Sequence, residues 1–117
     1  ISHMVGAVYN TQHGLTNAIL LPKILKFNKN VISQKINFMH FALFEKPGQF
    51  DDFYSNICNL LDDLEIPNGL DKIGVKNDKI NELALKSSKD AAALTNPRVA
   101  SINELESIIK DSVLKTR

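Results

Sequence analysis

The sequence predicts an all-α domain of five to seven helices joined by short loops. Apolar residues recur with the i, i+3, i+4, i+7 spacing of a helix in several stretches, whereas no stretch keeps the period-two alternation of a half-buried strand. Proline, glycine and helix-capping residues then divide the chain into segments of helical length. These observations together favour a helical domain over any fold built around a sheet.

The first 44 residues are expected to form three helical segments. Residues 1–8 resemble the end of a helix, residues 9–12 form a turn, and a new helix begins at about Gly14. Pro22 is expected to kink or end that helix, because proline lacks an amide donor and clashes with the preceding turn. Residues 31–44 are mostly apolar, with a few polar residues interspersed, and are expected to form a mostly buried helix.

The most regular helical pattern follows over residues 50–64. The run Ile66-Pro67-Asn68-Gly69 ends this helix. Cys58 lies on the apolar stripe and is therefore interpreted as a core residue, with no neighbour that marks an activated thiol. The stripe comprises Phe50, Phe53, Tyr54, Ile57, Cys58, Leu61 and Leu64.

Two further helices are predicted near the C-terminal end. The first is capped by Asn77 or Asp78, runs to about Asp90 and ends before Asn96-Pro97, because the residue before a proline avoids the α region. The second begins with Ser101 and Glu104, which form a capping box. Its apolar face consists of Ile102, Leu105, Ile109 and Val113.

Composition narrows the class of protein. The 117 residues fit one domain, and 44% apolar with 23% charged residues is ordinary for a globular protein. A net charge of +1 gives no electrostatic footprint for nucleic acid or an anionic membrane, and the longest apolar run, residues 18–22, is too short to span a bilayer. The single cysteine excludes an internal disulfide, which favours the cytoplasm as the expected location.

Two histidines stand in the most specific motif of the chain. It reads His3-x-x-Gly6-Ala7-x-Tyr9-Asn10-Thr11-x-His13-Gly14-x-x-Asn17-Ala18-x-Leu20-x-Pro22. This run resembles the signature of iron-containing alcohol dehydrogenases. One position departs from that pattern, because Gln12 replaces the usual proline and so loosens the turn without removing a chemical group.

The resemblance implies that His13 is a metal ligand. In that family one aspartate and three histidines hold a divalent metal, and the preceding histidine ligand would lie just before Ile1, so this chain supplies one ligand of the set. Gly14 would let the chain turn tightly beside the ligand. The alternative for His13 is a capping or surface histidine beside a turn.

The resemblance gives His3 a different role, next to the nicotinamide and the substrate. His3 would act as a catalytic proton relay or as a positioning and cofactor-binding residue, tasks that suit a group titrating near neutrality. One alternative is a histidine packed within a helix. The other is a remnant of an affinity tag, because cleavage of a tag often leaves the sequence Ser-His-Met, here Ser2-His3-Met4. His40 matches no motif and is expected to be a buried histidine bonded to a carbonyl.

A second part of the resemblance lies near the C-terminal end, in Asp90-Ala91-Ala92-Ala93-Leu94-Thr95-Asn96-Pro97-Arg98. Residues 96–98 are interpreted as structural, with Arg98 able to reach a carboxylate or carbonyl. The small residues 91–93 would let the chain pass close to the substrate cavity. The spacing Ile66-Pro67-x-x-Leu70-x-x-x-Gly74-Val75 also fits the family and is interpreted as structural.

The resemblance implies that residues 1–117 are the C-terminal helical metal-binding domain of a two-domain, dehydroquinate-synthase-like iron-dependent alcohol dehydrogenase fold. The N-terminal α/β nucleotide-binding domain is absent from the chain. The complete enzyme would transfer hydride between a small alcohol or aldehyde substrate and NAD or NADP, with Fe²⁺ as the expected metal and Zn²⁺ as the alternative. The isolated chain would be inactive.

The expected partners are the missing domain and, as a further candidate, a second copy of the chain in a homodimer. Removal of a covering domain would expose apolar residues, and Val5, Val8, Ile19 and Leu20 are the candidates for that surface. The alternative function is a free-standing helical interaction module without catalytic activity.

Overall fold

The computed structural model describes all 117 residues and contains only helices and connecting loops. The predicted all-α fold class is confirmed, with five α-helices and two short 3-10 helices. The α-helices are α1 (Ser2–Tyr9), α2 (His13–Phe44), α3 (Phe50–Asp63), α4 (Ile80–Ser88) and α5 (Ile102–Leu114). The 3-10 helices are η1 (Leu70–Ile73) and η2 (Ala91–Thr95).

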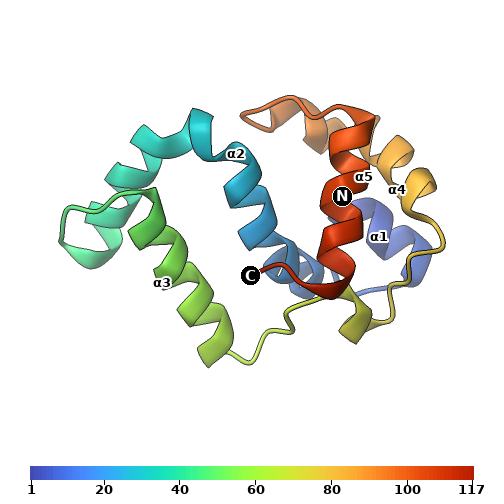
Figure 1. Ribbon diagram of the computed structural model, residues 1–117, viewed down its shortest axis with the longest axis horizontal. Coiled ribbons are helices and arrows are strands. Elements are labelled where there is room, and N and C mark those ends of the chain that lie inside the picture. Colours follow the sequence, from blue (N-terminus) through green and yellow to red (C-terminus); the bar gives the residue numbers. More distant parts are fainter.

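The main core lies among α1, the first part of α2, η1, α4 and α5. Figure 1 shows these elements gathered on one side of the molecule, with α5 in front of α1 and close to α4. Burying one large aliphatic side chain here stabilises the fold by about 1.5–3 kcal/mol. The core residues are Val5, Ile19, Leu20, Leu70, Val75, Leu83, Ala84, Leu105, Ile109 and Val113.

The rest of α2 extends away from this core, and α3 folds back against it to form a two-helix arm (Figure 1). A separate cluster of four buried residues, Ile32, Ile36, Phe50 and Phe53, holds the arm together. The connection between the two helices is closed by His40, whose Nδ1 lies 2.9 Å from the carbonyl oxygen of Lys46. His40 is 5% exposed, so the expected buried histidine bonded to a carbonyl is confirmed.

Pro22 was expected to kink or end its helix, and it does not end it, because α2 runs through the proline from His13 to Phe44, 32 residues in all. Proline removes only one hydrogen bond from the helix, and tertiary packing holds the helix on both sides of the break. Ile19 and Leu20 lie in the main core before Pro22, and Asn28 is buried after it. The long helix changes direction near its middle (Figure 1), which separates the core part from the arm.

The expectation that residues 31–44 form a mostly buried helix is also wrong. Phe38 is 80% exposed, Phe41 59% and Leu43 61%. Only Ile32, Ile36 and His40, spaced one turn apart, are buried in this half of the helix. The arm offers α2 a single partner helix, so only one face can be covered although apolar residues occupy most positions.

The predicted stripe of α3 is only partly buried. Phe50, Phe53 and Leu61 lie in the interior, whereas Cys58 is half-buried and Leu64 is exposed beyond the end of the helix. The interpretation of Cys58 as a core residue is therefore wrong, because the stripe is wider than the single face of α2 that covers it.

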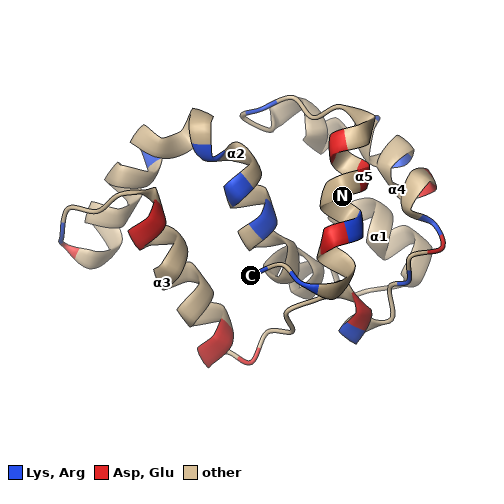
Figure 2. Cartoon of the chain, in the orientation of Figure 1, with Lys and Arg blue, Asp and Glu red and all other residues tan.

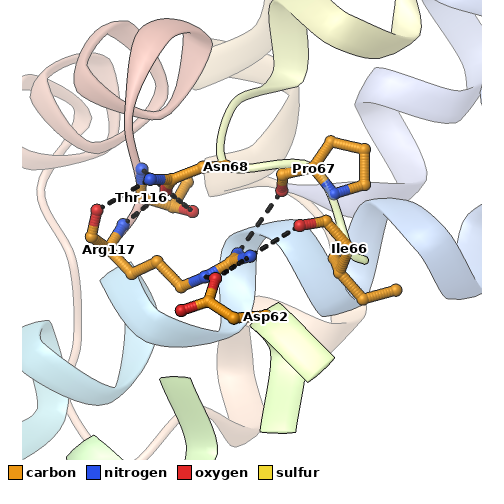
Figure 3. A network of polar contacts seen from close by, with 6 residues as sticks. All are labelled: Asp62, Ile66, Pro67, Asn68, Thr116 and Arg117. Carbon is orange, nitrogen blue, oxygen red and sulfur yellow. Dashed lines mark hydrogen bonds and ion pairs between the residues drawn. The ribbon is translucent and has the colours of Figure 1, made fainter. Parts of the chain in front are cut away.

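The chain after α3 is anchored by the C-terminal residues (Figure 3). The side-chain oxygen of Asn68 accepts hydrogen bonds from the backbone amides of Thr116 at 3.1 Å and Arg117 at 2.9 Å. The Arg117 guanidinium donates to the carbonyl oxygen of Ile66 and pairs with Asp62 at the end of α3. Nearby, Leu70 is fully buried and Gly74 has a φ of 88°, which confirms the structural interpretation of this stretch.

Of the caps predicted for the last two α-helices, one is confirmed and one is wrong. The predicted capping box of α5 is confirmed, since Ser101 and Glu104 bond to each other's backbone amides. The predicted cap of α4 is wrong, because its N-cap residue is Lys79 and no side chain caps it. Asp78 instead accepts a hydrogen bond from the Tyr9 hydroxyl at 2.5 Å, which ties this loop to the end of α1.

Acidic and basic side chains are scattered over α2, α3, α4 and α5, whereas α1 carries none (Figure 2). The second half of α2, where exposed apolar residues lie, carries few charges in this view, and the loop after it holds one acidic and one basic residue. None of the helices, the long α2 included, combines the length and apolar content that a bilayer crossing requires.

Candidate functional site

The tight connection between α1 and α2 brings the two motif histidines together. Asn10 ends α1 with a φ of 54°, and its amide donates to the Gly6 carbonyl oxygen at 2.9 Å. Asparagine tolerates this left-handed conformation better than most residues. The Thr16 hydroxyl, fully buried, lies 2.8 Å from both Thr11 Oγ1 and the Gln12 carbonyl oxygen and fixes the first turn of α2.

The expected role of Gly14 in a tight turn is wrong. Gly14 lies within the first turn of α2, has no left-handed φ, and a Cβ added there would meet no atom within 4 Å. Asn10 supplies the turn instead. The glycine therefore leaves open space beside His13 on the exposed side of the helix.

His3 and His13 stack face to face, with ring centroids 4.9 Å apart and an interplanar angle of 11°. Both residues are exposed, so each ring keeps an accessible edge. The sequence placed these residues ten positions apart, and the turn converts that spacing into direct contact. The pair forms the centre of the candidate site.

A carboxylate from a distant part of the chain orients His3. Asp90 Oδ2 lies 2.8 Å from His3 Nδ1, and the Asp90 side chain is only 8% exposed. Asp90 Oδ1 also accepts a hydrogen bond from the Ala92 amide at 2.9 Å and so caps η2. The Ala92 amide and then His3 hold the pKa of Asp90 below its ordinary value. An ionised carboxylate only accepts hydrogen bonds, so His3 donates from Nδ1 and presents Nε2 outward.

His13 has a neutral partner on its own helix, because the Asn17 side-chain nitrogen lies 3.0 Å from His13 Nε2. A metal ion could displace this neutral side-chain amide from the ring nitrogen, so His13 could serve as one metal ligand. No group of three or more His, Cys, Asp or Glu side chains in the chain converges on a point where a metal could sit. The residues present could therefore supply one ligand of a metal site, but they do not form a complete set of ligands.

The second motif lies beside this pair. Ala92 and Ala93 of η2 line a cavity of about 440 Å³ together with Ile1, Ser2 and Asn17. Asn17 thus contacts His13 and also borders the cavity. The small residues of η2 and the histidine pair belong to one region of the surface.

Residues 96–98 are structural, as predicted. Asn96 and Asn28 exchange two side-chain hydrogen bonds of 2.9 Å, which join the segment after η2 to the middle of α2. Arg98 donates to the Phe27 carbonyl oxygen at 3.0 Å, lies 4.0 Å from the centroid of the Phe27 ring and pairs with Glu104. This clamp holds η2 and its alanines against α2.

Sequence reasoning missed the roles of Asp90 and Asn17. Asp90 was expected as the approximate end of a helix and as the first residue of the second motif, without a partner, and its partner His3 lies 87 residues away in the chain. A local signal existed, since an aspartate before three alanines is typical of a cap. Nothing in the sequence, however, indicated which side chain its second oxygen would contact.

The sequence matches the model of the Fe-containing alcohol dehydrogenase family, C-terminal, over residues 1–113. It is 33% identical to NAD-dependent methanol dehydrogenase of Bacillus methanolicus, over 97% of this chain and 31% of that protein. It is 31% identical to lactaldehyde reductase of Escherichia coli K12, over 90% of this chain and 29% of that protein.

A solved structure shows the same similarity in the fold. The crystal structure of a 1,3-propanediol oxidoreductase superposes with a TM-score of 0.86 at 27% identity, over 95% of this chain and 31% of that one. The chain spans about a third of the length of the relatives that it matches. The chain belongs to the Fe-containing alcohol dehydrogenase family and has the fold of its C-terminal helical domain.

Proposed function

We propose that this chain is the C-terminal helical half of a metal-dependent, NAD- or NADP-linked alcohol dehydrogenase or aldehyde reductase. The observation that carries the proposal is the stacked pair of His3 and His13 at the start of α2, inside the stretch that matches the family. The relatives named above are dehydrogenases and reductases, which supports the same reaction class. An N-terminal nucleotide-binding domain would complete the active site.

In this proposal His13 contributes one ligand to a divalent metal, iron or zinc, and the other ligands come from outside residues 1–117. The exposed ring and its displaceable Asn17 partner support this role. The metal would supply Lewis acidity at the substrate oxygen, and the nicotinamide would supply the hydride acceptor.

His3 holds and moves a proton in the same proposal. Asp90 fixes the hydrogen on Nδ1, so the outward Nε2 can accept a proton from a neighbouring group and release it to solvent. The position of His3 within α1 and its bond to a buried carboxylate also support a native residue over a tag remnant.

Two variants of the proposed two-domain enzyme test these roles side by side. His13→Ala should lose bound metal and turnover together, because one ligand of a small set is removed. His3→Ala should keep its metal, while turnover falls by roughly 10²–10⁴-fold or changes its pH dependence. Metal analysis and steady-state kinetics make the comparison. Stoichiometric metal in the His13 variant contradicts the ligand role, and equal metal loss in both variants shows that the two roles are wrongly assigned.

A free-standing interaction module remains the second candidate function, and the exposed apolar side chains of the arm favour it. The residues expected to be exposed by removal of a covering domain are not exposed, because Val5, Ile19 and Leu20 are buried in the main core and Val8 packs against it. Phe38 and Phe41 are exposed instead. Light scattering on the 117-residue chain tests this candidate: self-association that a Phe38→Ser, Phe41→Ser double variant abolishes supports it, and a monomer at every concentration contradicts it.

A further inference from the structure

A second cleft lies between residues 23–26 of α2, the end of α5 and the C-terminal residues. Its volume is about 410 Å³, and it shares no residue with the cavity beside the histidine pair. Five of its nine lining residues are lysine or arginine, whereas Asp111 is the only acidic side chain among them. Figure 2 shows basic positions of α2 and α5 on either side of the C-terminal segment. The whole chain has a net charge of only +1, so positive charge is concentrated in this cleft.

Two of the five cations are already paired and hold the walls of the cleft in place. The Arg117 side chain is 6% exposed, and its guanidinium binds Asp62 and the carbonyl oxygen of Ile66. Lys23 pairs with Asp111 at 3.5 Å, which joins α2 to α5. These two cations therefore contribute little free charge.

The other three cations, Lys26, Lys110 and Lys115, are exposed, and no carboxylate oxygen lies within 4.0 Å of their ammonium nitrogens. The Lys26 ammonium lies 4.7 Å from the centroid of the Tyr54 ring, a contact that positions the charge without neutralising it. α5 ends in this cleft at Leu114, and the C-terminal end of a helix carries roughly half a negative charge. Three free ammonium groups exceed that charge several-fold, so the cleft keeps a positive potential.

The lining also indicates which kind of anion the cleft suits. Lysine binds phosphate as a compact point charge, and ammonium groups from different elements match an anion whose charge is spread over several oxygen atoms. Asn77 adds an exposed side-chain amide that can donate a hydrogen bond. Leu114 is the only hydrophobic lining residue, so a nucleobase or an acyl chain would find no apolar wall. These features favour a small inorganic anion with several charges.

We propose that this cleft binds a small inorganic polyphosphate, represented by pyrophosphate, through Lys26, Lys110 and Lys115. None of these lysines belongs to the histidine pair or contacts its partners Asp90 and Asn17. Binding requires neither a metal nor a nicotinamide, so a failure of this proposal and a failure of the proposed dehydrogenase function are separate results.

The first test titrates the 117-residue chain with pyrophosphate in phosphate-free buffer at low salt, by calorimetry and by two-dimensional NMR of the amides. Saturable binding is expected, with shifts at Lys26, Lys110 and Lys115 and none around the histidine pair. Orthophosphate carries less charge and should bind about tenfold more weakly. ADP should bind no more tightly than pyrophosphate, because the cleft offers its base no apolar wall.

The second test removes two of the free cations. The double variant Lys26→Gln, Lys115→Gln should weaken pyrophosphate binding by about tenfold or more, the value of one hydrogen bond to a charged group. The double variant Lys35→Gln, Lys89→Gln is the matched control, because it changes the net charge equally at two exposed lysines outside the cleft. The control should keep the wild-type affinity to within about twofold. All four side chains are exposed, so both variants should keep the wild-type melting temperature.

Four results would overturn the proposal. They are the absence of saturable binding, equal weakening in the two double variants, amide shifts centred on the histidine pair, and binding of ADP that is clearly tighter than that of pyrophosphate.

Discussion

Asp90 joins two functions in one side chain, because one oxygen caps η2 and the other orients His3. Both contacts favour the ionised carboxylate, which is why its pKa lies below the ordinary value of 3.8. A carboxyl whose pKa is lower in the folded state contributes stability that is present above its unfolded pKa. That contribution is lost as the pH falls through the folded-state pKa, so Asp90 makes the fold sensitive to acid.

Asp90→Asn should therefore flatten the acid side of the stability profile. Asparagine keeps an oxygen for the Ala92 amide but carries no charge, so the variant loses stability near neutral pH and loses less on acidification. Melting temperatures of both proteins between pH 7 and pH 3 measure the effect. Asp63→Asn is the matched control, because Asp63 is exposed and has no ion-pair partner. Parallel profiles for wild type and Asp90→Asn would contradict the coupling.

Whether a contact of the candidate site could be predicted from sequence depends on how far apart its two residues lie in the chain. His3 and His13 could be selected from the sequence because the motif that contains them is local and their contact spans one turn. The His3–Asp90 pair could not, because it depends on how α4 and η2 pack beside α1. The sequence also assigned the turn to Gly14, whereas the positive φ lies at Asn10, a residue in which local side-chain bonding permits the same conformation.

At the scale of single elements, Gly48 shows how the two-helix arm closes. A Cβ at this position would lie 2.4 Å from the His40 ring, which is buried and packs on Phe44. Gly48→Ala should therefore lower the free energy of unfolding by about 1–3 kcal/mol, the usual cost of overpacking. Gly14→Ala is the matched control, since it meets no neighbour and should leave stability unchanged or raise it by up to ~1 kcal/mol. Urea unfolding measures both, and a Gly48 variant as stable as wild type contradicts the proposed closure.

The capping box of α5 provides a second test at this scale. Ser101 Oγ accepts a hydrogen bond from the Glu104 amide at 3.2 Å, and Glu104 Oε2 accepts one from the Ser101 amide at 2.9 Å. Ser101→Ala should lower the free energy of unfolding by about 1 kcal/mol, because it removes the side-chain acceptor of the Glu104 amide in the first turn of α5. Ser107→Ala on the exposed face of the same helix should have little effect. If urea unfolding gives both variants equal stability, the cap contributes nothing measurable.

Helix patterns predicted the elements better than they predicted burial. The beginnings of α2, α3 and α5 follow from local capping and periodicity, and each was located within a residue or so. The long α2 was misjudged because periodicity cannot reveal how many partners a helix will have. Its second half carries apolar residues at most positions, yet only α3 covers it, and Phe38 remains 80% exposed.

At the scale of the whole molecule, the chain consists of a core and an arm that share α2. The shape is elongated, with principal extents of 43 × 30 × 19 Å. The C-terminal Arg117 reaches across to Asp62 at the end of α3 and so connects the arm to the core (Figure 3). The all-α class followed from sequence, whereas this division did not, because it arises from contacts between residues far apart in the chain.

The same whole-molecule view predicts that the 117-residue chain alone will not oxidise alcohols with NAD or NADP. One imidazole offers a metal a single ligand, and no group of three donors forms in the chain, so a divalent ion would be held poorly. The exposed histidine pair also has no second domain over it to exclude water or to position a nicotinamide.

The assay should follow nicotinamide absorbance with purified chain, added Fe²⁺ or Zn²⁺, and a series of primary alcohols. His13→Ala, made in the same chain, is the control for contaminating host enzymes, because any activity that it retains cannot depend on the proposed ligand. No turnover above that control is expected. Turnover by the wild-type chain that His13→Ala abolishes would show that these helices alone assemble a working site, and the proposed need for a nucleotide-binding domain would then be wrong.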